Sequence, residues 1–150
     1  MNQQIFLDRL ARIIEDSKAG ILATTDEEGR PHMRWMTPWL LPGREGALFS
    51  VTPPHFAKVA QLEKQPTVEW MIQTPSLDQV INIKGKVNFL DNPSIKMEVM
   101  EGLGSRLFVF WKANTGFSDF IVLETVMEEA CYYLPMKGTK EKIIFGDRGE

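Results

Sequence analysis

The chain has 150 residues, of which 43% are hydrophobic and 25% are charged, and its formal net charge is −3. A chain of this length can bury one hydrophobic core as a single domain, residues 1–150, without disulfides. The slight negative charge argues against a nucleic-acid partner, because such binding needs a basic face that neutralises phosphates.

Residues 1–5 lack the basic and apolar regions of a secretory signal, and no apolar run approaches the roughly 18 residues of a membrane span. We therefore expect a cytoplasmic protein without a membrane partner. The single cysteine, Cys131, has apolar and aromatic neighbours and is expected to be buried and unreactive. The two histidines and this cysteine lie far apart in the sequence, so we expect no metal site.

The N-terminal segment, residues 4–17, is predicted to be an amphipathic helix because its apolar residues fall on one helical stripe. Gly20 follows it as a helix stop. Strands are expected at 21–25 and 47–52, with an extended segment at 30–41 between them, because turn residues separate these runs.

Pro53-Pro54 ends the third of these segments and opens a helix that Gln65-Pro66 terminates. The remaining elements expected are strands 67–73 and 80–90, helices 92–101 and 105–112, a closing hairpin of strands 120–126 and 130–134, and an edge strand around 143–145. The total is six or seven short strands with few helices, a pattern typical of a β-barrel or a β-sandwich.

The junction between strand 47–52 and the following helix is a candidate anion site. Free backbone N–H groups at the start of a helix attract anions, and Lys58 lies about one turn into this helix. Thr52 ends the strand with a hydroxyl group. The alternative is a solvated lysine on an ordinary surface helix.

A second candidate lies on the extended segment 30–41. Arg30, His32 and Arg34 alternate with other residues, so one face of the strand carries three potential cations. Arginine suits phosphate because its planar guanidinium donates two parallel hydrogen bonds. The alternative is a solvent-facing polar edge. We do not expect His32 to be a general base, because the sequence identifies no acidic partner for it.

Aromatic residues supply candidate surfaces for a planar ligand. The chain has four tryptophans, and an aromatic ring offers a large rigid surface at small entropic cost. The run Phe108-Val109-Phe110-Trp111 is a dense apolar patch. We expect it to form both a dimer contact and a ligand wall.

Residues 21–90 resemble the pyridoxamine 5′-phosphate oxidase-like family of FMN-binding split barrels. The stretch Gly29-Arg30-Pro31-His32-Met33-Arg34 is similar to the family's Gly-x-Pro-x-x-Arg strand, whose arginine contacts the flavin phosphate. The resemblance implies this role for Arg34. It further implies that the following residues lie along the isoalloxazine ring; these are Trp35, Met36 and Thr37.

Other segments continue the resemblance in order. Thr52 and Lys58 are similar to a strand-end threonine and a phosphate-binding lysine on the next helix, and residues 83–87 resemble the family's Val-x-Gly-x-Ala segment. Further flavin contacts implied in this way are Val51, through its backbone, Gln79 at the ring and Trp111 of a partner subunit over the ring. The fold implied is mainly β, an antiparallel split β-barrel of six or seven strands with flanking helices, which works as a homodimer.

The chain departs from the oxidase pattern at three places. Phe56-Ala57 replaces a Ser-Arg pair before the phosphate lysine, and Trp39 stands where the oxidases have a lysine. His55 is expected to supply some of the lost donors. The C-terminal Trp-x-x-x-Arg-Leu substrate signature is missing, so the chain looks more like the general stress-protein or flavin-reductase-like branch than a true pyridoxamine phosphate oxidase.

The resemblance implies an FMN-binding flavoprotein, an oxidoreductase of unknown substrate with flavin between two subunits. The cofactor performs the electron transfer in such proteins, and no catalytic side chain is identified. Three alternatives stay open. The protein could be a flavin-binding or redox-sensing protein without turnover, a split barrel that binds haem or a deazaflavin, or a scaffold without a cofactor.

Overall fold

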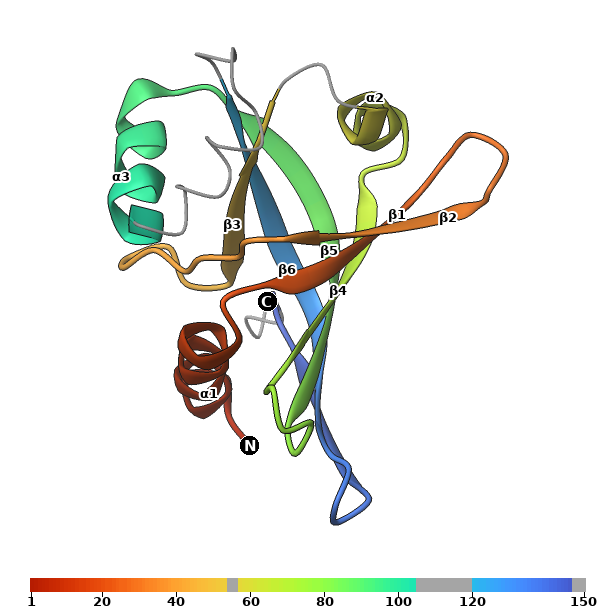
Figure 1. The fold of residues 1–150 in the computed structure, drawn as a ribbon, viewed down its shortest axis with the longest axis vertical. Coiled ribbons are helices and arrows are strands. Elements are labelled where there is room, and N and C mark those ends of the chain that lie inside the picture. The colour runs from red at the N-terminus through yellow and green to blue at the C-terminus, as the bar shows by residue number, and fades with distance from the viewer. Residues whose placement is uncertain (54–56, 105–119, 147–150) are drawn as a thin grey trace.

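The computed structural model describes residues 1–53, 57–104 and 120–146 (Figure 1). In these ranges it contains three helices and seven strands. In chain order they are α1 (Gln3–Ser17), β1 (Gly20–Thr25), β2 (Pro31–Met36), β3 (Ala47–Thr52), α2 (Ala57–Lys64), β4 (Thr67–Gln73), β5 (Val80–Leu90), α3 (Pro93–Leu103), β6 (Ile121–Leu134) and β7 (Thr139–Ile144). The protein is therefore mainly β, as predicted. The helix predicted at 105–112 lies outside the described residues.

All strand pairs are antiparallel, in the order β2-β1-β4-β5-β6-β3, with β7 paired to β6. The two outer strands of this order approach each other beyond the end of β2. There Trp39 and Phe49 exchange two backbone hydrogen bonds of 2.7 Å. The sheet therefore curls round toward closure, as expected for a split barrel (Figure 1).

The predicted closing hairpin at 120–134 is wrong, because β6 is one continuous strand of 14 residues. Its register against β5 shifts from Lys84↔Glu129 to Gly85↔Met127, which leaves Glu128 as an extra, bulged residue. The bulge interrupts the alternation of side chains at the place where the sequence suggested a turn. The two halves of β6 also have different neighbours, since residues 121–126 pair with β3 and residues 129–134 pair with β7.

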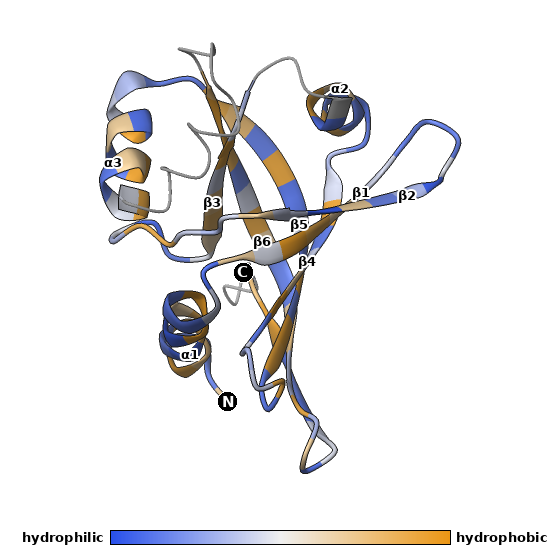
Figure 2. Ribbon diagram, in the orientation of Figure 1, coloured by the Kyte–Doolittle hydropathy of each residue, from blue (hydrophilic) through white to orange (hydrophobic). Residues whose placement is uncertain are grey.

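Most of the core lies inside the curled sheet. Inward-facing strand residues such as Leu22, Trp70 and Ile83 are fully buried there. One face of α1 covers this core, and Leu62 of α2 also packs into it. Hydrophobic and hydrophilic residues alternate along strands such as β5, whereas β3 is buried along its whole length (Figure 2). A second cluster joins α3 to the other face of β3, where Phe49 is buried.

Three further sequence expectations concern the cysteine, membrane spans and metal sites. Cys131 is half-buried rather than fully buried, because it faces away from the core between its inward-facing neighbours Ala130 and Tyr132. None of the described helices has the length and apolar character needed to cross a bilayer. Among the described residues, no group of three histidine, cysteine or acidic side chains is placed to hold a metal ion.

Candidate functional site

The junction of β3 and α2 brings a lysine onto a buried threonine. Thr52, the last residue of β3, is 1% exposed. The ammonium group of Lys58, in the first turn of α2, donates a hydrogen bond of 2.9 Å to its Oγ1. The side chain of Lys58 therefore points back toward the strand end, as an anion site at this junction requires.

Arg34 of β2 supplies a second cation beside Lys58. Alternation along β2 places Arg34 on the same face as the buried Met36, and its Nη1 donates to the Leu22 carbonyl over 3.1 Å. Burial, and to a lesser extent the positive charge of Arg34, lower the pKa of Lys58 to about 8. Burial also lowers the pKa of Arg34. Two partly buried cations thus lie close enough to repel each other.

Helix α2 is held against β1 by a polar contact that the sequence analysis did not identify. Oγ1 of Thr24 donates a hydrogen bond of 2.9 Å to Oε1 of Gln61. Gln61 lies three residues after Lys58, so both side chains share one helix face. Val59 and Leu62 form the buried face of the helix. This docking directs Lys58 toward Arg34.

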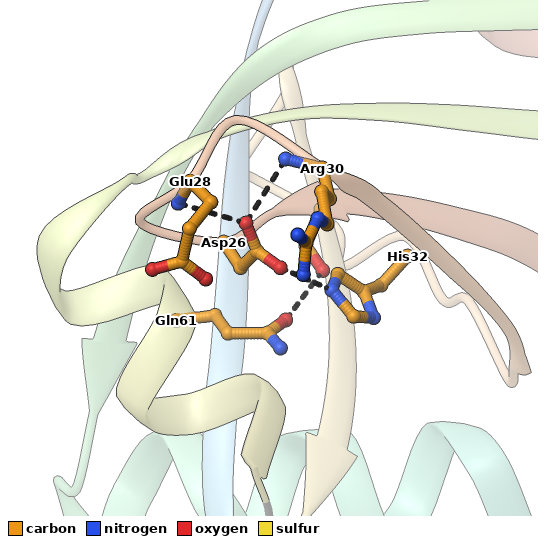
Figure 3. A network of polar contacts seen from close by, with 6 residues as sticks. Asp26, Glu28, Arg30, His32 and Gln61 are labelled. Atoms are coloured by element: carbon orange, nitrogen blue, oxygen red, sulfur yellow. Dashed lines mark hydrogen bonds and ion pairs between the residues drawn. The ribbon is translucent and has the colours of Figure 1, made fainter.

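The turn between β1 and β2 contains an acidic partner for His32, contrary to the sequence interpretation. Oδ2 of Asp26 lies 2.8 Å from Nε2 of His32, and Oδ1 accepts hydrogen bonds of 2.9 Å from the backbone amides of Glu28 and Arg30 (Figure 3). The contact with His32 is the main cause that lowers the pKa of Asp26, followed by the Arg30 amide. The hairpin register, which pairs Thr25 with Pro31, is the signal that would have revealed this pair.

Of the predicted flavin contacts, the structure brings together Arg34, Thr52 and Lys58. Met36 is buried in the core and Thr37 is half-buried. Trp35 lies on the opposite face of β2 from Arg34 and is 63% exposed. The side chain of Val51 packs in the α3 cluster, away from Thr52.

Gln79 is not brought to these residues within one chain. It precedes β5, and its Oε1 accepts a hydrogen bond of 2.7 Å from the hydroxyl of Tyr132. The opposite end of β5, Leu90, pairs with Val122, which is the residue opposite Val51 of β3. Gln79 and the strand end at Thr52 thus lie near opposite ends of β5, whose path along its 11 residues is about 33 Å. His55 and Trp111 lie outside the described residues.

Comparison with known proteins decides the family. The family model described as pyridoxamine 5′-phosphate oxidase matches residues 6–133, most of the chain. The chain belongs to this family. The search of curated proteins gave no match.

Solved structures share the fold of this family member. A protein related to general stress protein 26 of Bacillus subtilis, from Clostridium acetobutylicum, has a TM-score of 0.73 at 15% identity, with 97% of each chain covered. A pyridoxamine 5′-phosphate oxidase-related, FMN-binding protein from Nostoc punctiforme has a TM-score of 0.65 at 14% identity, covering 90% of this chain and 86% of that one. A haem-binding protein from Mycobacterium smegmatis has a TM-score of 0.68 at 18% identity, covering 88% and 55%.

Proposed function

We propose that this protein binds FMN through its phosphate at the site formed by Arg34, Thr52 and Lys58. The observation that carries the proposal is that Lys58 turns back onto the buried Thr52 over 2.9 Å, where Arg34 is close enough to repel its charge. Holding two like charges together away from water is unfavourable, and a phosphate between them would offset that repulsion. The residues present therefore fit a dianionic group.

The family membership and the FMN-binding neighbour support FMN as the phosphate-bearing ligand. Met36 and Thr37, which follow Arg34 in the chain, would hold the ring through their backbone, as the family resemblance implies. When bound, FMN supplies the electron-transfer chemistry. Arg34, Thr52 and Lys58 bind and orient its phosphate, and we propose an oxidoreductase whose substrate is not specified by these residues.

We propose further that the protein is a homodimer with the flavin between the subunits. The outer face of β2 supports this, since Met33 is 73% exposed and Trp35 is 63% exposed. Large apolar side chains side by side on a strand are typical of an interaction surface. Trp35→Asp should therefore yield a monomer in light scattering, with wild-type circular dichroism. A wild-type protein that is already monomeric at micromolar concentration would contradict the dimer.

The binding site is tested by titrating the protein with FMN and with riboflavin, which lacks the phosphate, and following flavin fluorescence. We expect Lys58→Met to weaken FMN binding about 10- to 100-fold, as for the loss of a charge-assisted hydrogen bond, and to leave riboflavin binding unchanged. Lys64→Met is the matched control, because Lys64 is on the same helix but pairs with Glu27. Equal wild-type affinities for FMN and riboflavin would contradict the proposed site.

Catalysis is tested separately from binding. The absorption spectrum of the purified protein distinguishes bound flavin from haem, the ligand of the M. smegmatis neighbour. If flavin is present, oxidation of a reduced nicotinamide with an added acceptor would support an oxidoreductase. Tight flavin binding without turnover would favour a flavin-binding or redox-sensing protein.

A further inference from the structure

The Asp26–His32 pair lies on the continuation of the proposed phosphate site. Alternation along β2 places His32 and Arg34 on one face, two residues and about 7 Å apart. Across from this face, Gln61 of α2 bonds to Thr24, and Thr24 is the partner of His32 in the β1–β2 register. On α2, Lys58 therefore lies near Arg34, and Gln61, about one turn further along the helix, lies near His32. Figure 3 shows Gln61 beside His32.

We infer that His32, held by Asp26, is a proton-dependent third cationic group of this anion site. Protonation of its imidazole strengthens the binding of a phosphate between Arg34 and Lys58. The inference rests on the proposed function and adds a residue that determines selectivity for the phosphorylated ligand. Histidine suits such a role because imidazole as a class changes charge between pH 5 and 8.

The sign of the effect is the same whichever member of the pair holds the added proton. Without that proton the Asp26–His32 pair carries one negative charge, and with the proton on either side chain the pair is neutral. Protonation therefore adds one positive charge near the phosphate. Because His32 is partly exposed, solvent screens the interaction. If the distance from His32 to the phosphate equals the strand spacing of His32 and Arg34, about 7 Å, Coulomb's law at a water-like dielectric gives about a three- to tenfold change in affinity for a dianion.

Other charged groups on the β1–β2 turn, β2 and α2 set the background of the measurement. The β1–β2 turn contributes Asp26, Glu27, Glu28 and Arg30; β2 contributes Arg34; and α2 contributes Lys58 and Lys64. Glu27 is paired with Lys64. The phosphate itself titrates near pH 6. The pH profile of the wild-type Kd alone therefore reflects several titrations. Dividing the Kd of a His32 variant by the wild-type Kd at each pH removes the contributions that both proteins share.

The experiment measures the Kd of FMN from pH 5.5 to 8 for the wild type and for His32→Gln. We expect the ratio of the variant Kd to the wild-type Kd to be near one at pH 8 and to rise three- to tenfold at pH 5.5. With riboflavin the ratio should stay near one throughout. His32 is half-exposed, so the substitution should leave the fold intact.

Asp26→Asn provides a second test that keeps the Oδ1 acceptor for the Glu28 and Arg30 amides. Removing its negative charge should tighten FMN binding about three- to tenfold at pH 8. Glu28→Gln is the matched control, because it removes the same charge from the same turn without touching the His32 ring, and its pH profile should follow the wild type.

The outcomes separate the two proposals. A His32→Gln ratio that stays constant with pH, in a protein that still prefers FMN to riboflavin, overturns the role of His32 and leaves the phosphate site standing. The role of His32 is likewise overturned if Glu28→Gln changes the pH profile of FMN affinity as much as Asp26→Asn does. A wild type that does not distinguish FMN from riboflavin overturns both.

Discussion

Nζ of Lys58 donates a 2.9 Å hydrogen bond to Oγ1 of Thr52 and so ties the first turn of α2 to the last residue of β3. The threonine is buried and the lysine is partly buried, so the contact holds the ammonium group at a fixed place near Arg34. The two residues are six positions apart, on different elements. Their contact makes the strand end and the helix act as one binding surface.

We predict that Thr52→Val weakens FMN binding about fivefold. Valine matches threonine in shape but cannot accept the hydrogen bond that orients Lys58, and a lost hydrogen bond of this kind corresponds to about 1 kcal/mol. Fluorescence titration measures the change. Thr52→Ser keeps the hydroxyl and should restore most of the affinity, so equal losses in both variants would contradict an orienting role for Oγ1.

The unliganded protein should be more stable without the charge of Lys58. Its pKa in the folded state is about 8, below the usual 10.5, so the charged lysine destabilises the fold below about pH 8, and this effect fades as the pH rises to 10.5. Lys58→Met should raise the Tm of flavin-free protein at pH 7 by about 2–4 °C, for a solvent-screened effect of about 1 kcal/mol.

The control for that measurement is Lys64→Met. The contact with Glu27 raises the pKa of Lys64, so its charge is favourable and its removal should not increase the Tm. The gain for Lys58→Met should also shrink between pH 8 and 10. A lower Tm for Lys58→Met at pH 7 would show that the lysine stabilises the unliganded fold.

FMN affinity should fall at alkaline pH because Lys58 loses its proton. In the free protein its pKa is about 8, so binding above this pH requires proton uptake. We expect about a tenfold loss of affinity between pH 8 and 9.5 by isothermal titration calorimetry. Lys58→Arg keeps its charge over this range and should flatten the profile. A wild-type profile parallel to that of Lys58→Arg would exclude Lys58 as the titrating group.

Gly85→Ala should destabilise the fold strongly. A Cβ atom at this position would lie 2.2 Å from the backbone oxygen of Val126, beside the bulge of β6. Relief requires a shift of the paired backbone, and we expect a loss of about 2–3 kcal/mol in the free energy of unfolding by denaturant titration. Lys86→Ala, at an exposed position of the same strand, is the control and should change it little.

Several elements were predictable because their signals are local. The predicted bounds of β3, β4 and β5 agree with the structure. Side chains alternate along β4 and β5, whereas β3 is buried throughout and is delimited by Gly46 and Pro53 on either side. The prediction of a hairpin at 120–134 was wrong because its signal is not local. The bulge at Glu128 depends on how β6 pairs with β5, and residues distant in sequence decide that pairing.

The sequence by itself determined the family resemblance and three residues of the site, because Arg34, Thr52 and Lys58 occur in short motifs with characteristic spacing. Only the tertiary structure decided which charges meet. The proximity of Arg34 to Lys58 depends on the docking of α2 through Thr24 and Gln61, which are 37 residues apart. Likewise, the β1–β2 register brings Asp26 to His32. The length of β5 separates Gln79 from the strand end at Thr52. Electrostatic interactions depend on distance in space, which a one-dimensional spacing does not specify.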